Sequence, residues 1–150
     1  MEENQLKKCR LLAQKVRKHC LEMVCKGKSG HIGSMLSMAD ILPVLYTKIL
    51  NVDSANPKML DRDRFILSKG HGGAALLATL AELGFFPLDW LNQYYCDNGK
   101  LSGHISHHIP GWNFPPALWG MDFRLPAEWQ WRRNRQENST VFSVCPAMET

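Results

Sequence analysis

The amino-acid composition of this chain changes abruptly after Gly111, most clearly in its basic residues. This change of composition most strongly limits what the chain can fold into. All ten Lys and all six His lie before Gly111, whereas the 39 residues from Trp112 onward contain no Lys and four of the five Trp. The first 111 residues are enough to bury a hydrophobic core of their own. We therefore take residues 1–111 as one domain and interpret residues 112–150 separately.

Helical periodicity dominates the beginning of the chain. Apolar side chains recur there at spacings of three and four residues: Leu6, Cys9, Ala13, Val16, Cys20 and Met23. They predict a helix over about residues 4–26, followed by a polar turn at residues 27–30. A second helix is expected to begin near Ser37, whose hydroxyl can cap it, and Pro43 predicts a kink or a later start. Its expected buried residues are Ile41, Leu42, Leu45, Ile49 and Leu50.

A short strand, a glycine turn and a helix follow one another between residues 64 and 83. Residues 64–68 are apolar enough for a buried strand, and residues 74–83 are strong helix formers that stop at Gly84. Backbone N–H groups converge where a glycine turn enters a helix, so the turn at residues 69–73 is a predicted anion site. Residues 87–95 predict a further short helix, and residues 96–111 predict a loop.

Three histidines each follow a glycine in a separate turn. They are His31, His71 and His104. One histidine alone is more often structural than catalytic, but three in the same local setting indicate a functional site. An imidazole donates or accepts a hydrogen bond and moves a proton near neutral pH, which suits a substrate with several hydroxyl groups.

The residues around these histidines resemble the N-terminal part of transketolase. The matching motifs are residues 29–34 (Ser-Gly-His-Ile-Gly-Ser), 38–40 (Met-Ala-Asp), 61–72 (Asp-Arg-Asp-Arg-Phe-Ile-Leu-Ser-Lys-Gly-His-Gly), 101–104 (Leu-Ser-Gly-His) and 110–111 (Pro-Gly). The resemblance covers about residues 5–111. The chain is similar in particular to the split form of transketolase, in which the N-terminal subunit is a separate chain. Ile32 departs from the proline that is usual in the family, and residues 106–108 (Ser-His-His) also depart from its pattern.

The resemblance implies an α/β fold, as the N-terminal and incomplete part of a doubly wound thiamine-diphosphate-binding domain. The implied function is transfer of a two-carbon ketol unit between sugar phosphates, with thiamine diphosphate and Mg²⁺ as cofactors. His31 is then implied to be catalytic through contact with substrate hydroxyls, and His71 to lie near the cofactor's diphosphate. His104 is implied to be both catalytic and cofactor-binding, because it would face the thiazolium and the substrate's terminal hydroxyl.

The partners implied by the resemblance are sugar phosphate substrates and a C-terminal transketolase subunit. In the family that other half carries the glutamate that activates the cofactor, so this chain alone is expected to be inactive. A homo- or hetero-oligomer is expected. Two alternatives stay open: a non-catalytic fragment that only pairs with the C-terminal subunit, and a related deoxyxylulose-phosphate synthase-like enzyme that shares Gly30 and His31.

Residues 112–150 resemble the family only in another reading frame. After Gly111 the family continues with Val-Glu and a glycine-rich cofactor loop, and later with an Asp-Gly metal motif. We assigned suitable codons to residues 112–125 and read them one base earlier. They then translate as Val-Glu-Phe-Ser-Thr-Gly-Ala-Leu-Gly-His-Gly-Phe-Ser-Val. With suitable codons, the same shift gives an Asp-Gly pair nearer the end of the chain. Trp and Met each have a single codon, so no choice of codon is possible at these residues. The shifted translation agrees with the family sequence there as well. Our hypothesis is that one nucleotide was lost near codon 111, which would leave a non-family, poorly ordered tail.

An authentic divergent tail is the alternative to a shifted frame. A nucleic-acid patch is disfavoured, because the four Arg of the tail are balanced by four acidic residues. That patch would consist of Trp129, Trp131, Arg132, Arg133 and Arg135. No nucleic-acid partner is expected.

Two other groups of residues have the composition of a possible site. A zinc shell would use Cys96, His104, His107 and His108. Their spacing matches no common zinc pattern, so no metal site is assigned. Residues 61–64 (Asp-Arg-Asp-Arg) favour a structural ion-pair network over a catalytic set.

Cysteine usage and the N-terminal residues favour a cytoplasmic protein. Five cysteines, an odd number without tight pairing, indicate free thiols in a reducing compartment. The first residues are acidic and lack the hydrophobic core of a signal peptide. No apolar run is expected to approach the ~18 residues of a membrane span, so no membrane attachment is expected.

Overall fold

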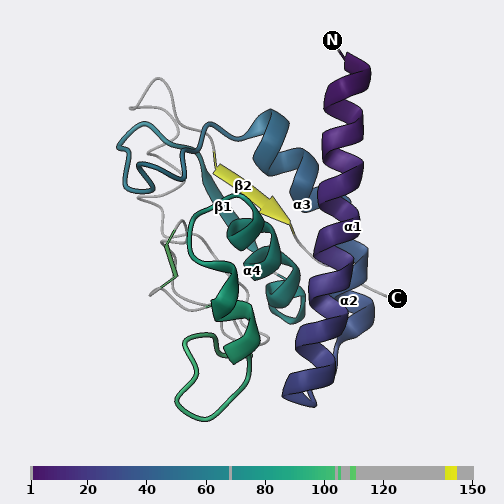
Figure 1. Ribbon diagram of the computed structural model, residues 1–150. Coiled ribbons are helices and arrows are strands. Elements are labelled where there is room, and N and C mark those ends of the chain that lie inside the picture. The colour runs from purple at the N-terminus through teal and green to yellow at the C-terminus, as the bar shows by residue number, and fades with distance from the viewer. Residues whose placement is uncertain (1, 68, 104, 106–108, 111–140, 145–150) are drawn as a thin grey trace, which may run out of the picture.

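Residues 2–67, 69–103, 105, 109–110 and 141–144 are described by a computed structural model (Figure 1). Its helical elements are α1 (Glu2–Gly27), α2 (Ile32–Met38), α3 (Ile41–Val44), the π-helical turn η1 (Leu45–Ile49), the 3-10 turn η2 (Gly70–Gly72), α4 (Gly73–Glu82) and the 3-10 helix η3 (Leu88–Gln93). The strands are β1 (Arg64–Leu67) and β2 (Val141–Val144). Figure 1 shows the long helix α1 along one side of the molecule, with α4 and the strands beside it.

Helix α1 buries most of the apolar stripe predicted from its periodicity. Val16, Cys20 and Met23 are buried, as are Cys9 and Ala13, which confirms the predicted helix and its core-facing side. The prediction is wrong for Leu6, which is 50% exposed. The first turns of α1 extend past the elements on which this helix packs, so the buried stripe begins one turn later (Figure 1).

The second predicted helix is divided, and it begins earlier than expected. Ser37 lies inside α2, and its hydroxyl donates to the Ser34 carbonyl at 2.8 Å, so the predicted cap at Ser37 is wrong. A turn at residues 39–40 separates α2 from α3. Pro43 lies four residues after Ala39, and a proline ring clashes with the carbonyl at that spacing. The helix is thus interrupted before Pro43, and its second part begins at Ile41, in agreement with the predicted kink or later start.

The π-helical turn η1 brings part of the expected buried face to the surface. Leu50 N–H donates to the Leu45 carbonyl at 2.8 Å, five residues back. Leu42 and Leu50 are buried as predicted, but Ile41 and Ile49 are 43% and 49% exposed, so the prediction is wrong for these two. The break before α3 and the wider π turn interrupt the spacing of three and four on which the prediction depended.

Helix α4 is buried on every side. Every residue from Gly73 to Ala81 is buried. Helices α1, α2 and α3 and the short helix η3 pack around it, and its leucines share one core with residues 65–67 of β1. A helix without a solvent-facing polar side belongs in such an interior. The helix predicted at residues 74–83 is confirmed, and Gly84 follows it with a φ of 84°.

Strands β1 and β2 form a parallel pair, in which Arg64 pairs with Val141 and Leu67 with Val144. Residues 65–67 are buried in succession, as is typical of a parallel strand covered on both faces. Parallel strands joined through helices define an α/β arrangement, as the sequence predicts. Residues 141–144 belong to the segment expected to be poorly ordered, and they form β2, whereas residues 111–140 and 145–150 lie outside the described residues.

The cysteines that the structure describes are free thiols, as expected. They are Cys9, Cys20, Cys25 and Cys96. Burial raises the pKa of the Cys20 thiol to about 12, so Cys20 remains protonated and acts as a core residue.

The expectation about apolar runs is wrong. The 18 residues Ile32–Ile49 are long and apolar enough to cross a membrane by length and composition. A core helix of a soluble protein passes the same test, so this finding alone does not indicate a membrane span. In the structure the stretch is divided into α2, α3 and η1, and both α2 and α3 pack on α1 and α4. The absence of membrane attachment therefore stays a prediction.

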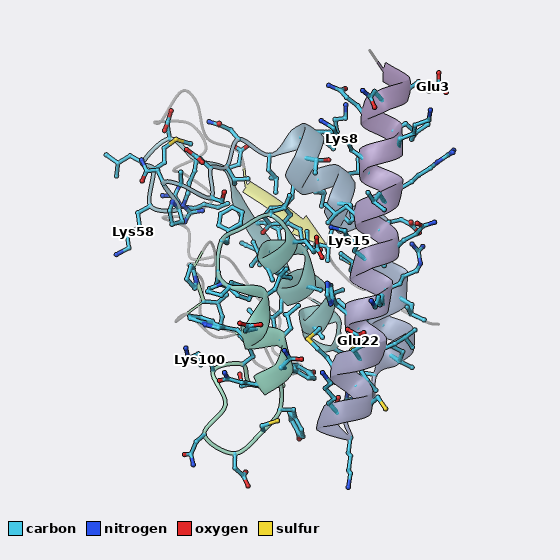
Figure 2. The ribbon with its side chains drawn as sticks, viewed as in Figure 1. Glu3, Lys8, Lys15, Glu22, Lys58 and Lys100 are labelled. Carbon is cyan, nitrogen blue, oxygen red and sulfur yellow. The ribbon has the colours of Figure 1, made fainter. Side chains whose placement is uncertain are left out.

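Glu82 fastens the end of α4 to α1. Its side chain is 9% exposed, and its carboxylate accepts hydrogen bonds from Lys15 Nζ at 2.7 Å and from His19 Nε2 at 2.8 Å. Figure 2 shows Lys15 on the side of α1 that faces α4. Burial alone would raise the pKa of Glu82, but the hydrogen bonds and charges of Lys15 and His19 outweigh it, so this pKa lies below its ordinary value. The two partners also offset the unfavourable position of a carboxylate at a helix C-terminus.

Leu76→Ala should lower the free energy of unfolding by about 2–5 kcal/mol, because Leu76 is fully buried in α4 and its loss leaves a cavity. Leu11→Ala is the matched control on α1. Leu11 is 56% exposed, so its loss should change stability by less than about 0.5 kcal/mol. Urea unfolding followed by circular dichroism measures both variants. Equal losses would contradict a core centred on α4.

Glu82→Gln should destabilise the protein by about 1–2 kcal/mol at neutral pH, because it removes the charged acceptor of Lys15 and His19. The pKa of Glu82 is lowered in the folded state, so this stability is fully present above the unfolded-state pKa of 4.5. It is lost as the pH falls through the folded-state pKa. The gap between wild-type and variant urea midpoints should therefore close in acid.

Glu3→Gln is the control for this pH series, because Glu3 and Lys7 form a pair that is exposed on both sides. Its urea midpoint should follow that of the wild type at every pH. A gap between wild type and Glu82→Gln that persists unchanged in acid would show that the charge of Glu82 is not the stabilising feature.

Candidate functional site

His31 is held in an uncommon backbone conformation at the start of α2. It is the N-cap residue, with a φ of 70° and a ψ of 18°, and its carbonyl accepts a hydrogen bond from Met35 N–H at 3.2 Å. The imidazole makes no capping hydrogen bond. Positive φ is rare for residues other than glycine, and such strain often accompanies functional sites. The fold therefore imposes this conformation and leaves the imidazole for another role.

His71 reaches the same place from the turn between β1 and α4. It is the middle residue of η2, and its ring stacks on that of His31. The ring centroids are 4.0 Å apart, and the ring planes differ by 17°. The structure thus brings together two of the three histidines singled out in the sequence.

A glycine permits this close approach. Gly72 is buried, and an added Cβ would lie 3.2 Å from Met38 Cγ and 3.6 Å from the Ser34 carbonyl oxygen. The first distance is tighter than an ordinary van der Waals contact, so a side chain here would require Met38 or η2 to shift by a few tenths of an ångström. Gly72 therefore allows the backbone of His71 to lie close to the helix that begins after His31.

Two backbone N–H groups of this turn are not available for the predicted anion site, so the prediction is wrong for these two groups. Gly72 N–H donates to the Lys69 carbonyl at 2.9 Å, and Gly73 N–H donates to the Gly70 carbonyl. Both amides close η2 and are not directed at a ligand.

His104 lies outside the described residues, but its neighbours on both sides do not. Ile105 is buried, and its backbone nitrogen lies 3.5 Å from the position of a Cβ added to Gly73. On the other side, the Tyr94 hydroxyl donates to the Gly103 carbonyl at 3.4 Å. Ile105 therefore lies beside the first residue of α4, which follows His71 by two positions in the chain.

Within the described ranges, no group of three or more His, Cys, Asp or Glu side chains could hold a metal ion. Of the possible zinc ligands, Cys96 is exposed and its thiol donates to the Tyr94 carbonyl at 3.4 Å. His104, His107 and His108 lie outside the described residues.

The acidic and basic residues before β1 have a structural role. Asp63 N–H donates to the Asn51 carbonyl at 2.9 Å, and Asp63 Oδ2 accepts Asn51 N–H at 2.8 Å. Buried Arg62 donates to the Asp63 carbonyl at 3.0 Å. These hydrogen bonds hold the loop that enters β1 in place. The ion-pair network expected over residues 61–64 stays a prediction.

Sequence reasoning missed a contact between the two histidine turns. Lys69 Nζ, in the turn of His71, donates to Ser37 Oγ in α2 at 2.9 Å. The sequence interpretation used Ser37 only as a helix cap and gave Lys69 no role. A hydrogen bond between residues so far apart leaves no local pattern that could reveal it.

Comparisons with known proteins identify the family. Residues 8–113 match the family model described as transketolase, thiamine diphosphate binding domain. The chain is 45% identical over 92 residues to a 6-deoxy-6-sulfo-D-fructose transketolase subunit of Clostridium sp. (strain MSTE9), covering 61% of this chain and 34% of that protein. It is 39% identical over 107 residues to an apulose-4-phosphate transketolase subunit of Phocaeicola vulgatus, covering 71% of this chain and 38% of that protein.

Solved structures agree with this result. Transketolase from Leishmania mexicana matches with a TM-score of 0.64 at 34% identity, over 69% of this chain and 16% of that chain. Transketolase from Campylobacter jejuni matches with the same TM-score and identity, over 73% of this chain and 17% of that chain. The fold is thus the N-terminal part of a thiamine diphosphate-binding domain. The chain belongs to the transketolase family, and it spans about a third of the length of the two curated relatives.

His31→Gly should be more stable than His31→Ala by about 1 kcal/mol, because glycine adopts a φ of 70° without strain and alanine does not. Urea unfolding of both variants measures the difference. The comparison with alanine isolates the effect of the backbone, since both changes remove the imidazole. A glycine variant that is the less stable of the two would show that the conformation at residue 31 is not strained.

Proposed function

We propose that this chain supplies part of the thiamine diphosphate and sugar phosphate site of a transketolase, which a C-terminal subunit completes. The observation that carries the proposal is the stack of His31 on His71, with ring centroids 4.0 Å apart. His31 is exposed and His71 is half-buried, so this pair forms an edge that a polar ligand can reach. Membership of the transketolase family supplies the nature of that ligand.

The histidines have different tasks in this proposal. His31, the outer ring, hydrogen-bonds to the hydroxyl groups of the sugar. His71, the inner ring between β1 and α4, hydrogen-bonds towards the diphosphate of the cofactor. His104 is proposed to orient the substrate's terminal hydroxyl and to move its proton. When bound, thiamine diphosphate supplies the electron sink for cleavage of a carbon–carbon bond.

The described residues fit the organic cofactor but not its metal ion. A Cβ added to Gly30 or Gly33, on either side of His31, would meet nothing within 4 Å, so the edge beside the stack has room for a ligand. A metal-binding group of carboxylates, histidines or cysteines is not found among the described residues. In our frameshift hypothesis, the Asp-Gly motif of the family is reached only when suitable codons of the tail are read in the shifted frame. We therefore assign no Mg²⁺ ligand and derive no step through the metal.

A partner chain is supported by the names of the relatives. Both curated relatives are named as subunits of a transketolase, which implies that each works with at least one further chain. We propose by analogy that this chain pairs with a C-terminal subunit in a homo- or hetero-oligomer. The proposed substrate class is a sugar phosphate. The two relatives are named for different sugars, so neither sugar is assigned to this chain.

We propose that this chain alone is inactive, and the hypothesis of a lost nucleotide near codon 111 supports this proposal. The family match ends at residue 113, two residues after Gly111. The glycine-rich cofactor loop of the family appears only when suitable codons after Gly111 are read one base earlier. Loss of one nucleotide at this codon would remove that loop, and with it one side of the cofactor site, while leaving the histidine stack in place.

The 150-residue chain should show no micromolar binding of thiamine diphosphate in the presence of Mg²⁺ by isothermal titration calorimetry. Inserting one nucleotide in the Gly111 codon should regenerate the loop and restore that binding. Inserting three nucleotides at the same codon is the matched control, because it adds a residue and keeps the present frame. Micromolar binding by the unaltered chain, or codons that do not regenerate the loop, would contradict the proposal.

A further inference from the structure

A hydrogen-bonded bridge joins the two turns that carry the stacked histidines. Lys69 lies two residues before His71, and its Nζ donates to Ser37 Oγ at 2.9 Å. Ser37 Oγ in turn donates to the Ser34 carbonyl at 2.8 Å, within the helix that begins after His31. We propose that this Lys69–Ser37 bridge positions His71 against His31, an inference that rests on the proposed function of the stack.

The directions of the two hydrogen bonds are compatible. An ammonium group only donates, and a hydroxyl has one proton to give, so Ser37 accepts from Lys69 and gives its proton to Ser34. The bond to Ser34 keeps the hydroxyl lone pairs available to the ammonium group. A hydrogen bond with a charged donor is stronger than a neutral one.

Helix α2 needs an external attachment because it is short. It has seven residues and no side-chain cap at its start, and a helix of this length has little stability of its own. Buried Met35 and Met38 hold its inner face, and Gly72 packs closely on Met38. The bridge adds a second attachment, at the exposed Ser37. The bridge thus holds the turn of His71 to the helix of His31 at a second point, beside the packing of Gly72 on Met38.

The bridge acts on position more than on stability. Ser37 is exposed and Lys69 is half-buried, so water competes for both groups. Polar contacts at such exposed positions contribute little to the free energy of unfolding. Loss of the bridge should therefore leave the helices folded, and its effect should appear in the distance between the two rings.

The test is a nuclear Overhauser contact between the ring protons of His31 and His71 in the 150-residue chain with isotope-labelled histidine. The wild type should show the cross-peak, because the ring centroids are 4.0 Å apart. Lys69→Met should weaken it several-fold, and Lys69→Arg should retain it, because a guanidinium also donates to a hydroxyl. Lys58→Met is the control, since Lys58 extends away from the body of the molecule (Figure 2).

Ser37 provides a second, milder pair of variants. Ser37→Ala should weaken the cross-peak as Lys69→Met does, and Ser37→Thr should retain it, with the helical circular dichroism unchanged in both. A full cross-peak in Lys69→Met and Ser37→Ala would overturn the bridge while leaving the stack and the proposed function intact. A wild-type chain without the cross-peak would overturn the stack, and with it both proposals.

Discussion

The enclosure of α4 is the constraint on which the rest of the structure depends. A helix of small and aliphatic residues with every side buried has to be surrounded, and α1, α2, α3 and η3 gather around it. That enclosure also determines where α4 begins, and the turn that begins it is η2, which carries His71. The candidate site therefore takes its position from the hydrophobic core. The carboxylate of Glu82 holds the opposite end of the same helix against α1.

Two local features let the histidines meet at the edge of this core. A positive φ at His31 turns the chain sharply into α2, and the absence of a side chain at Gly72 lets η2 lie against that helix. Neither feature is chemically reactive. Together they place two imidazoles face to face at a surface that a polar ligand can reach, in a domain whose family binds thiamine diphosphate.

Features that repeat along the chain could be predicted from the sequence, and contacts between distant residues could not. Periodicity predicted α1, and the apolar run at β1 and the helix formers of α4 predicted those elements. The start of α2 was missed because His31 adopts a left-handed conformation that no residue pattern reveals. The motifs around the histidines identified the family, but their spacing held no information on the distance between His31 and His71. The roles of the individual histidines stay predictions.

The pairing of Arg64 with Val141 has a consequence for synthesis on the ribosome. Strand β1 and helix α4 leave the exit tunnel long before β2, so the nascent chain carries a strand edge whose parallel partner is still untranslated. Closing so long a loop is slow, and an unpaired edge can recruit the same edge of a neighbouring nascent chain. Translation that stalls before residue 141 would prolong this exposure and make the half-finished chain a substrate for chaperones.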